Sequence, residues 1–457
     1  MSAIDATKNG GVTPAGYPSS LKTTPDKYTS LGDLLDYQKP DNRDLLIKTF
    51  GDQGITGFLQ LTGATRSAGT NDEVQYWEEG RLHKTVAFNT VDSDSINCPA
   101  FTATTAPCRL NDVLLLENGE RVVVTGIDAA NNELDIVRMN GGTVSAISTS
   151  GVAAIVGNIY AQGSGQPSEF YQTEVVKREN PFFITKETYH VTGSQATNIG
   201  WINIGNGDYR WYVKGEMDTR KRFMNQREMM LLYGQAVTDT TTALADKIDL
   251  AEGSVPGSEG YFQAVERRGL VASVSGGAQG TFADMSDIDG IILELDKEGA
   301  PAEYAMYLNR AASLDIDDML AQGIATQVTA GLPGQFGAFN NDADMAVKLG
   351  FKSFTRGGYT FHKHDWKLLN DPNLGALGDV KGAMVPLANV VDAKTGNSAP
   401  ALEMNYKGTG GYNRDVEHWV RGSVLGYNNM SEDVAEFYYR SECNLITRAA
   451  NQHVLIK

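Results

Sequence analysis

The 457-residue sequence contains little cysteine and little proline. Three cysteines, Cys98, Cys108 and Cys443, are too few for a disulfide framework in a chain of this length, and they favour a reducing compartment. A pairing of Cys98 with Cys108 across a hairpin stays open as an alternative. The 14 prolines stand against 49 glycines, which fits the turns and bulges of a β-rich chain better than disorder.

Positive charge is also scarce, because 39 Lys and Arg face 56 Asp and Glu and leave a formal net charge of −17. Proteins that hold nucleic acid neutralise phosphates with clustered cations, so we expect any DNA contact to be weak and non-specific. No run of eighteen apolar residues occurs, and the N-terminal MSAIDATKNGG lacks the basic start and apolar core of a signal peptide. These absences predict a protein without a membrane partner that stays soluble in a cytosol.

The common catalytic and cofactor motifs are missing. G-x-x-x-x-G-K-[ST], H-E-x-x-H and G-x-S-x-G do not occur. His362, His364 and Asp365 can supply part of a zinc or iron site, but a further ligand has to come from elsewhere, and histidines on one side of a strand are more often packed or surface residues. The nearest calcium-loop pattern has Met285 at the first ligand position and ends on Asp296 instead of Glu. We therefore predict no enzyme, no cofactor and no metal.

One stretch is strongly acidic. From Asp284 to Asp344 there are twelve acidic residues and two basic ones, Lys297 and Arg310. Paired carboxylates for glycoside hydrolysis are possible in such a run, but no interleaved aromatic residues accompany them. A solvated acidic face is the plainer interpretation.

The longest helical pattern runs from Asp208 to Gln235. Apolar residues at steps of four or seven share one face of this helix: Tyr209, Val213, Met217, Met224 and Leu231. Asp208 can cap its start, and Gly234 can adopt the left-handed turn that closes a helix. The cations on its other faces form either a solvated face or contacts with acidic residues of other subunits.

Strand patterns precede this helix. Residues 73–91 are strand-like on both sides of Gly80, and residues 169–201 are extended, so we expect the two to pair as a long β arm. Between about 99 and 161, strands at 113–116 and 121–125 flank Asn118-Gly119, and a third follows at 133–138. This module predicts a small barrel or curled sheet inserted in the arm.

Helices and strands alternate after the long helix, which indicates an α/β subdomain. The expected elements are a helix capped by Asp284 or Ser286, a strand at 303–308, a helix beginning at Ser313 and two strands joined at Gly357-Gly358. Strands at 401–406, 417–425 and 436–446 end the chain and are expected to pack on the long helix. Residues 1–40 are polar and turn-rich, and residues 41–50 predict a short helix.

This order of elements resembles the major capsid proteins of tailed bacteriophages, the Hong Kong 97-type fold. The β insertions in the extended loop of these proteins are similar to NDVLLLENGERVVVTGIDAANNELDIVRMNGG. Their axial domain is similar to LGFKSFTRGGYTFHKHD with GAMVPL, and their last strands are similar to EFYYRSECNLITRAANQHVLI. The crAss-like phages are the most similar group. The resemblance implies an α+β fold with these parts: N-terminal arm and short helix (1–72), extended β loop (73–205) with its insertion (about 99–161), spine helix of the peripheral domain (206–240), axial domain (241–390) and return strands of the peripheral domain (391–457).

The resemblance also implies function. The chain would assemble with itself, as pentamers and hexamers, into an icosahedral shell around phage DNA, in the host bacterial cytoplasm, with portal and decoration or auxiliary proteins as virion partners. An isolated β hairpin is only marginally stable in water, and contacts with symmetry-related copies can stabilise it. The predicted assembly residues are Tyr76, Trp77, Arg81, Lys177, Arg178, Arg210, Lys214, Arg220, Arg222 and Arg227. The alternatives are a tail-tube or adhesin subunit, and a metal-dependent hydrolase using His362 and His364.

Overall fold

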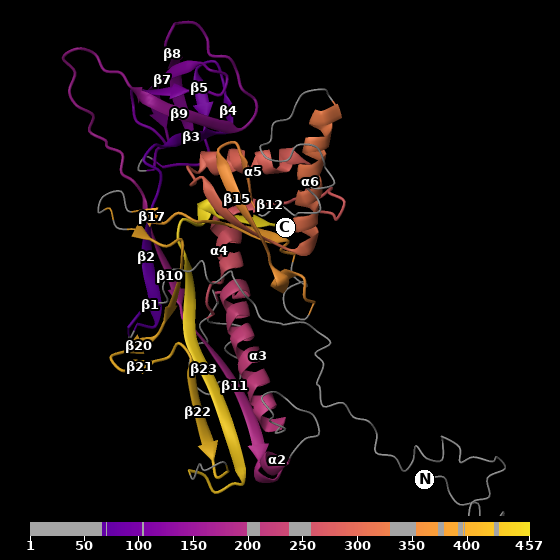
Figure 1. Cartoon of the computed structure of the whole chain (residues 1–457). Coiled ribbons are helices and arrows are strands. Elements are labelled where there is room, and N and C mark those ends of the chain that lie inside the picture. The colour runs from indigo at the N-terminus through magenta and orange to yellow at the C-terminus, as the bar shows by residue number, and fades with distance from the viewer. Residues whose placement is uncertain are drawn as a thin grey trace, which may run out of the picture. The chain divides into compact units, whose positions relative to one another are not determined.

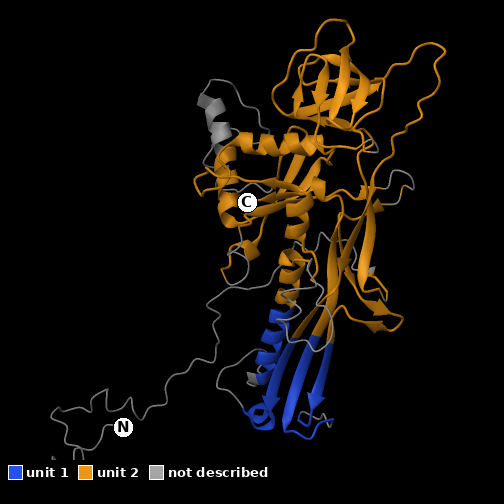
Figure 2. Cartoon of the chain, turned by 180° about the vertical axis from the view of Figure 1, so that it is seen from behind, with its two compact units in different colours: residues 1–54, 187–223, 418–439 blue, residues 55–186, 224–417, 440–457 orange. Residues whose placement is uncertain are grey.

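The computed structural model describes residues 66–69, 71–102, 105–198, 211–236, 257–329, 353–372, 379–391, 396, 398–424 and 429–457 (Figure 1). Residues 1–65 of the predicted N-terminal arm and short helix, with Asp208, Tyr209 and Arg210, lie outside these residues. The chain divides into two compact units, one of residues 1–54, 187–223 and 418–439 and the other of residues 55–186, 224–417 and 440–457 (Figure 2).

A two-stranded ribbon follows the first short strand of the larger unit. Strand β2 (Glu73–Glu79) pairs antiparallel with β10 (Val175–Pro181), with Trp77 opposite Lys177 and Tyr76 opposite Arg178. The predicted pairing between residues 73–91 and residues 169–201 is therefore confirmed. Since side chains alternate along a strand, the ribbon has two distinct faces.

The module between the ribbon strands is a seven-stranded sheet of order β3-β9-β6-β7-β8-β5-β4. Its strands are β3 (Thr85–Phe88), β4 (Thr90–Val91), β5 (Ser95–Asn97), β6 (Asp112–Leu115), β7 (Arg121–Asp128), β8 (Glu133–Arg138) and β9 (Gly151–Asn158). The predicted β6–β7 and β7–β8 hairpins are present. The sheet is larger than predicted and begins before residue 99, because β3 pairs with β9.

Cys98 and Cys108 lie buried in the apolar core of this module as free thiols. Burial raises the pKa of Cys98 to about 11 and that of Cys108 to about 12, so both are protonated near neutral pH. The alternative of a disulfide between them is not realised in the structure.

The α/β part of the larger unit is a six-stranded sheet of order β12-β24-β16-β13-β15-β14. Its strands are β12 (Leu270–Ala272), β13 (Glu303–Leu308), β14 (Ser353–Arg356), β15 (Tyr359–Asp365), β16 (Gly382–Pro386) and β24 (Val454–Ile456). Alternate residues of β13 face opposite sides: Tyr304 and Met306 pack with α5 (Met285–Lys297) and α6 (Arg310–Thr329), and Ala305 and Tyr307 pack with α4 (Tyr261–Arg268). The sheet is thus the middle of three layers.

Most of the predicted caps and turns of the α/β part are confirmed. Asp284 caps α5 by accepting from the Ser286 amide, and Gly357 and Gly358 take positive φ in the β14–β15 hairpin. Ser313 does not begin the next helix: α6 starts at Arg310, and the Asn309 side chain accepts from the Ala312 amide. Strand β24, predicted among the peripheral return strands, pairs with β12 and β16 inside this sheet.

The remaining large sheet has the order β1-β19-β23-β11, with β22 also paired to β23. Its strands are β1 (Arg66–Ser67), β11 (Phe183–Thr192), β19 (Leu402–Tyr406), β22 (Glu417–Gly422) and β23 (Val434–Thr447). Smaller elements are β17 (Val390–Val391), β18 (Ser398–Ala399), β20 (Gly408–Thr409), β21 (Tyr412–Asn413), α2 (Gly193–Thr197), η2 (Lys367–Leu369) and η3 (Ala450–Gln452). In the smaller unit, Phe223 lies against Tyr439, with ring centroids 5.7 Å apart.

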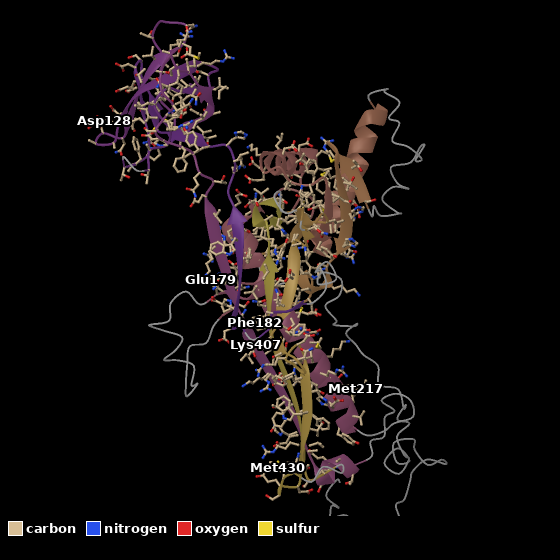
Figure 3. The ribbon with its side chains drawn as sticks, turned by 90° about the vertical axis from the view of Figure 1, so that its left-hand side faces the viewer. Asp128, Glu179, Phe182, Met217, Lys407 and Met430 are labelled. Carbon is tan, nitrogen blue, oxygen red and sulfur yellow. The ribbon has the colours of Figure 1, made fainter. Side chains whose placement is uncertain are left out.

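The long helix is α3 (Trp211–Tyr233), close to its predicted bounds. Of its predicted apolar face, Leu231 is buried, Val213 and Met224 are half-buried, and Met217 is exposed (Figure 3). The other buried side chains of the helix are Thr219, Phe223, Arg227 and Leu232. Gly234 is not left-handed. Its backbone amide continues the helix by donating to Met230 O at 2.9 Å. Within the described residues no helix has both the length and the apolarity to cross a membrane.

Candidate assembly surface on the β2–β10 ribbon

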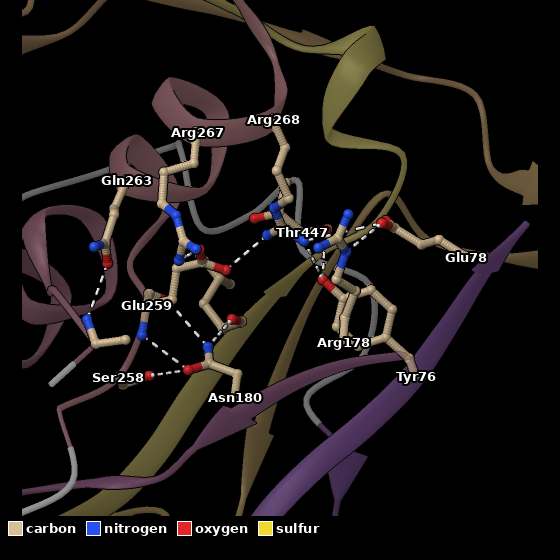
Figure 4. A network of polar contacts seen from close by, with 12 residues as sticks. Tyr76, Glu78, Arg178, Asn180, Ser258, Glu259, Gln263, Arg267, Arg268 and Thr447 are labelled. Carbon is tan, nitrogen blue, oxygen red and sulfur yellow. Dashed lines mark hydrogen bonds and ion pairs between the residues drawn. The ribbon is translucent and has the colours of Figure 1, made fainter. Parts of the chain in front are cut away.

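The inner face of the ribbon is fixed to its own chain by a polar network (Figure 4). The Tyr76 hydroxyl donates to Thr447 O at 3.1 Å and accepts from Arg268 at 3.1 Å. Arg178 pairs with Glu78 at 3.0 Å, and Arg268 pairs with Glu259 at 2.6 Å. Burial raises the pKa of Tyr76, so this hydroxyl keeps the proton that it donates.

Asn180 closes the network at the other end of β10. Its side-chain amide donates to Leu445 O at 2.8 Å and to Glu259 O at 3.0 Å, and its carbonyl oxygen accepts from the Glu259 amide at 2.8 Å. A buried side chain with all of these partners holds the ribbon to β23 and to the start of α4. The inner face is therefore an intrachain contact.

The outer face carries the alternate residues and has little cover. Trp77 is 65% exposed and Val175 is 55% exposed. Lys177, opposite Trp77, pairs with Glu179 at 3.1 Å, and Glu179 is marked in Figure 3. Tryptophan is enriched among the residues that contribute most of the binding energy in protein interfaces, so Trp77 makes this face the candidate assembly surface.

Arg81 follows the ribbon and makes contacts inside its own chain. One of its guanidinium nitrogens donates to Lys297 O at 2.8 Å and to Glu298 at 2.7 Å. These acceptors lie at the end of α5, where carbonyl groups lack partners within the helix. Arg81 thus links the turn after β2 to the α/β part.

Most of the predicted α3 cations also have partners in the chain. Lys214 pairs with Asp218, and Arg222 pairs with Glu187 at 2.7 Å. Arg220 is exposed. The prediction of a surface cation at position 227 is wrong, because the Arg227 side chain is buried and pairs with Asp415.

The structure therefore divides the predicted assembly residues. On the ribbon, Trp77 and Lys177 lie on the open face, and Tyr76 and Arg178 lie on the face that binds the chain itself. Strand alternation is the sequence signal that separates Tyr76 from Trp77. Exposed Val175, opposite Glu79, was missed, and the same alternation places it beside Trp77 and Lys177.

The candidate metal ligands have other partners. His362 Nε2 lies 2.9 Å from Glu303, Asp365 pairs with Arg310 at 2.6 Å, and the His364 ring stacks on Tyr307. Among the residues that the structure describes, no group of three or more His, Cys, Asp or Glu side chains is placed to hold a metal.

The calcium-loop pattern lies within helix α5, so it is not a loop. Asp289 binds Arg356 there, and Asp296 accepts from the Tyr359 hydroxyl at 2.6 Å. Farther along the acidic run, Asp317 pairs with Lys363 at 2.5 Å. Much of the expected solvated acidic face is thus neutralised by cations and donors from other segments.

Comparison with known proteins gives structural matches alone, because no family model and no curated protein matches. The chain is similar to one in the capsid structure of cyanophage P-SCSP1u, with 9% identity, a TM-score of 0.42 and coverage of 97% of this chain and 98% of that chain. The mature capsid of bacteriophage PhiM1 gives 8% identity, a TM-score of 0.40, and 95% and 98% coverage. Mycobacterium phage Ogopogo gives 8% identity, a TM-score of 0.41, and 93% and 98% coverage. At these TM-scores the matches carry no functional argument.

Proposed function

We propose that this chain is a shell subunit, the major capsid protein of a tailed phage, which assembles with copies of itself into an icosahedral capsid around DNA. The observation that carries the proposal is the β2–β10 ribbon, whose inner face is tied to its own chain and whose outer face leaves Trp77 and Val175 exposed. Trp77 and Val175 on this face would gain free energy if a second copy covered them.

The finer features follow from the sequence resemblance. The partners are other copies in pentamers and hexamers, a portal and decoration or auxiliary proteins, and assembly takes place in the host bacterial cytoplasm. Membership of the crAss-like group is part of this proposal. With a net charge of −17 the chain is suited to enclosing DNA without binding it tightly.

The test is assembly of the purified protein, measured by light scattering during size-exclusion chromatography and by negative-stain microscopy. We expect closed particles from the wild-type chain and soluble, folded, unassembled protein from Trp77→Ser. The control is Val391→Ser, which removes an apolar side chain that is 60% exposed on another strand. A wild-type chain that stays a compact monomer at high concentration would refute the proposal.

Two alternatives have less support. A tail-tube or adhesin subunit predicts no single long helix, whereas α3 has 23 residues. Micrographs with stacked rings or trimeric fibres would favour that alternative. A hydrolase would need His362 and Asp365 to leave Glu303 and Arg310. One equivalent of tightly bound metal in the purified protein would support the hydrolase alternative.

A further inference from the structure

Phe170 is an exposed aromatic residue held between two fixed neighbours. It lies between β9 and β10, and its side chain is 81% exposed. On one side, Arg109 donates to Glu169 O at 3.2 Å. On the other, the Tyr171 hydroxyl donates to the buried carboxylate of Asp112.

Arg109 completes this clamp. Its guanidinium carbon lies 4.1 Å from the centre of the Tyr171 ring, and its backbone amide donates to Asp112 at 2.8 Å. Cation–π contact and charge-assisted hydrogen bonds therefore order residues 169–171 in the unbound chain. An anchor residue that is ordered before binding loses less entropy when it binds.

A hollow on the same chain is suited to receive an aromatic ring. It has a volume of about 300 Å³ and lies between α5 and β12, which is an edge strand of its sheet. Its lining includes Val271, Val274, Gly290, Ile291, Asp287 and Glu294. An apolar cavity of about 150 Å³ already holds benzene in another protein, so the ring of a phenylalanine fits the volume.

Gly290 keeps the α5 side of this hollow open. A Cβ atom added at Gly290 would have no heavy atom within 4 Å, so packing inside the chain does not require glycine there. Glycine in the middle of a helix is also disfavoured relative to other residues. Both facts are explained if a partner side chain uses the space.

We propose that Phe170 of one copy inserts into the α5–β12 hollow of a second copy. The inference rests on the proposed self-assembly and names one of its contacts. In its own chain Phe170 is exposed, so it does not fill this hollow itself. Because the two surfaces differ, the contact is head-to-tail, the type that repeats around a ring of subunits.

Two single substitutions test the contact from opposite sides. Phe170→Ala removes the anchor, and Gly290→Leu fills the hollow while favouring the helix. We expect each to raise the protein concentration for half-maximal assembly at least tenfold, with an unchanged circular dichroism spectrum. Tenfold corresponds to about 1.4 kcal/mol, less than burial of a phenylalanine side chain contributes.

The control is Leu293→Ala, which removes a 62% exposed side chain from α5 outside the residues that line the hollow and should leave assembly unchanged. The double variant Phe170→Ala/Gly290→Leu should be no worse than about twofold beyond either single variant, because both remove the same contact. Wild-type assembly that neither substitution weakens, or fully additive effects, would overturn the inference and leave the proposed function intact. A wild-type chain that never assembles would instead refute the proposed function.

Discussion

His453 makes folding stability depend on pH. Its side chain is fully buried, with Nδ1 3.1 Å from the Tyr261 hydroxyl and the two rings 5.6 Å apart. Burial lowers the pKa of His453 from 6.5 to about 3, because the charged imidazolium would lose its hydration. The residue is thus neutral in the folded chain throughout the usual pH range.

The sign follows from the lowered pKa. Above pH 6.5 both folded and unfolded chains hold a neutral imidazole, so the residue costs nothing. Between pH 6.5 and 3 the unfolded chain binds a proton that the folded chain excludes, and stability is lost as the pH falls. At pH 5, one and a half units below 6.5, the loss is about 2 kcal/mol at about 1.36 kcal/mol per unit.

His453→Gln removes this titration and keeps an amide oxygen that can accept from Tyr261. We expect a lower free energy of unfolding at pH 8 than in the wild type, but a loss between pH 8 and pH 5 that is smaller by about 2 kcal/mol. The assay is urea unfolding followed by tryptophan fluorescence, on protein kept below its assembly concentration. His83→Gln, at an exposed position, is the control and should keep the wild-type pH dependence. Equal pH dependence in His453→Gln and the wild type would refute the reasoning.

Three further predictions concern α3, its end and α5. Burial raises the pKa of Glu228 to about 7, so its ionisation costs stability as the pH rises from 4.5 through 7. Glu228→Gln should therefore stabilise the chain by about 1 kcal/mol at pH 8, after allowance for partial exposure, and by almost nothing at pH 4, in urea unfolding. Arg227→Met leaves Asp415 without its cation and should cost about 3 kcal/mol, whereas the double variant with Asp415→Asn should recover part of that loss in a thermal melt. Gly234→Ala should destabilise by about 2 kcal/mol, because its Cβ would lie 2.4 Å from a backbone oxygen, while Gly290→Ala, with open space, should stabilise by up to about 1 kcal/mol. Equal melting temperatures for the two glycine variants would contradict this reading of their surroundings.

Several elements were predictable from the sequence because their causes are local. The β6–β7 hairpin follows from Asn118-Gly119, and Gly119 has the expected positive φ. Helix α5 is capped by Asp284, one of its two predicted caps. A turn, a cap and a period-two or 3.6-residue pattern each depend on residues a few positions apart, so the sequence contains the whole signal.

Other features depend on which distant segments meet. Apolar spacing on α3 predicted a buried Met217 and placed Arg227 on another face, yet Met217 is exposed and Arg227 is buried. Asp415, from far along the chain, pairs with the buried guanidinium. Strand β3 belongs to the seven-stranded module because β9, more than sixty residues away, offers it an edge.

The candidate assembly surface shows the same division. The alternation of β2 alone separates Tyr76 from Trp77 onto opposite faces. Which face stays open was decided in three dimensions, where Thr447 and Arg268 reach Tyr76 and leave Trp77 exposed. Backbone periodicity sets the direction of a side chain, but only the packing of remote segments decides whether anything covers it.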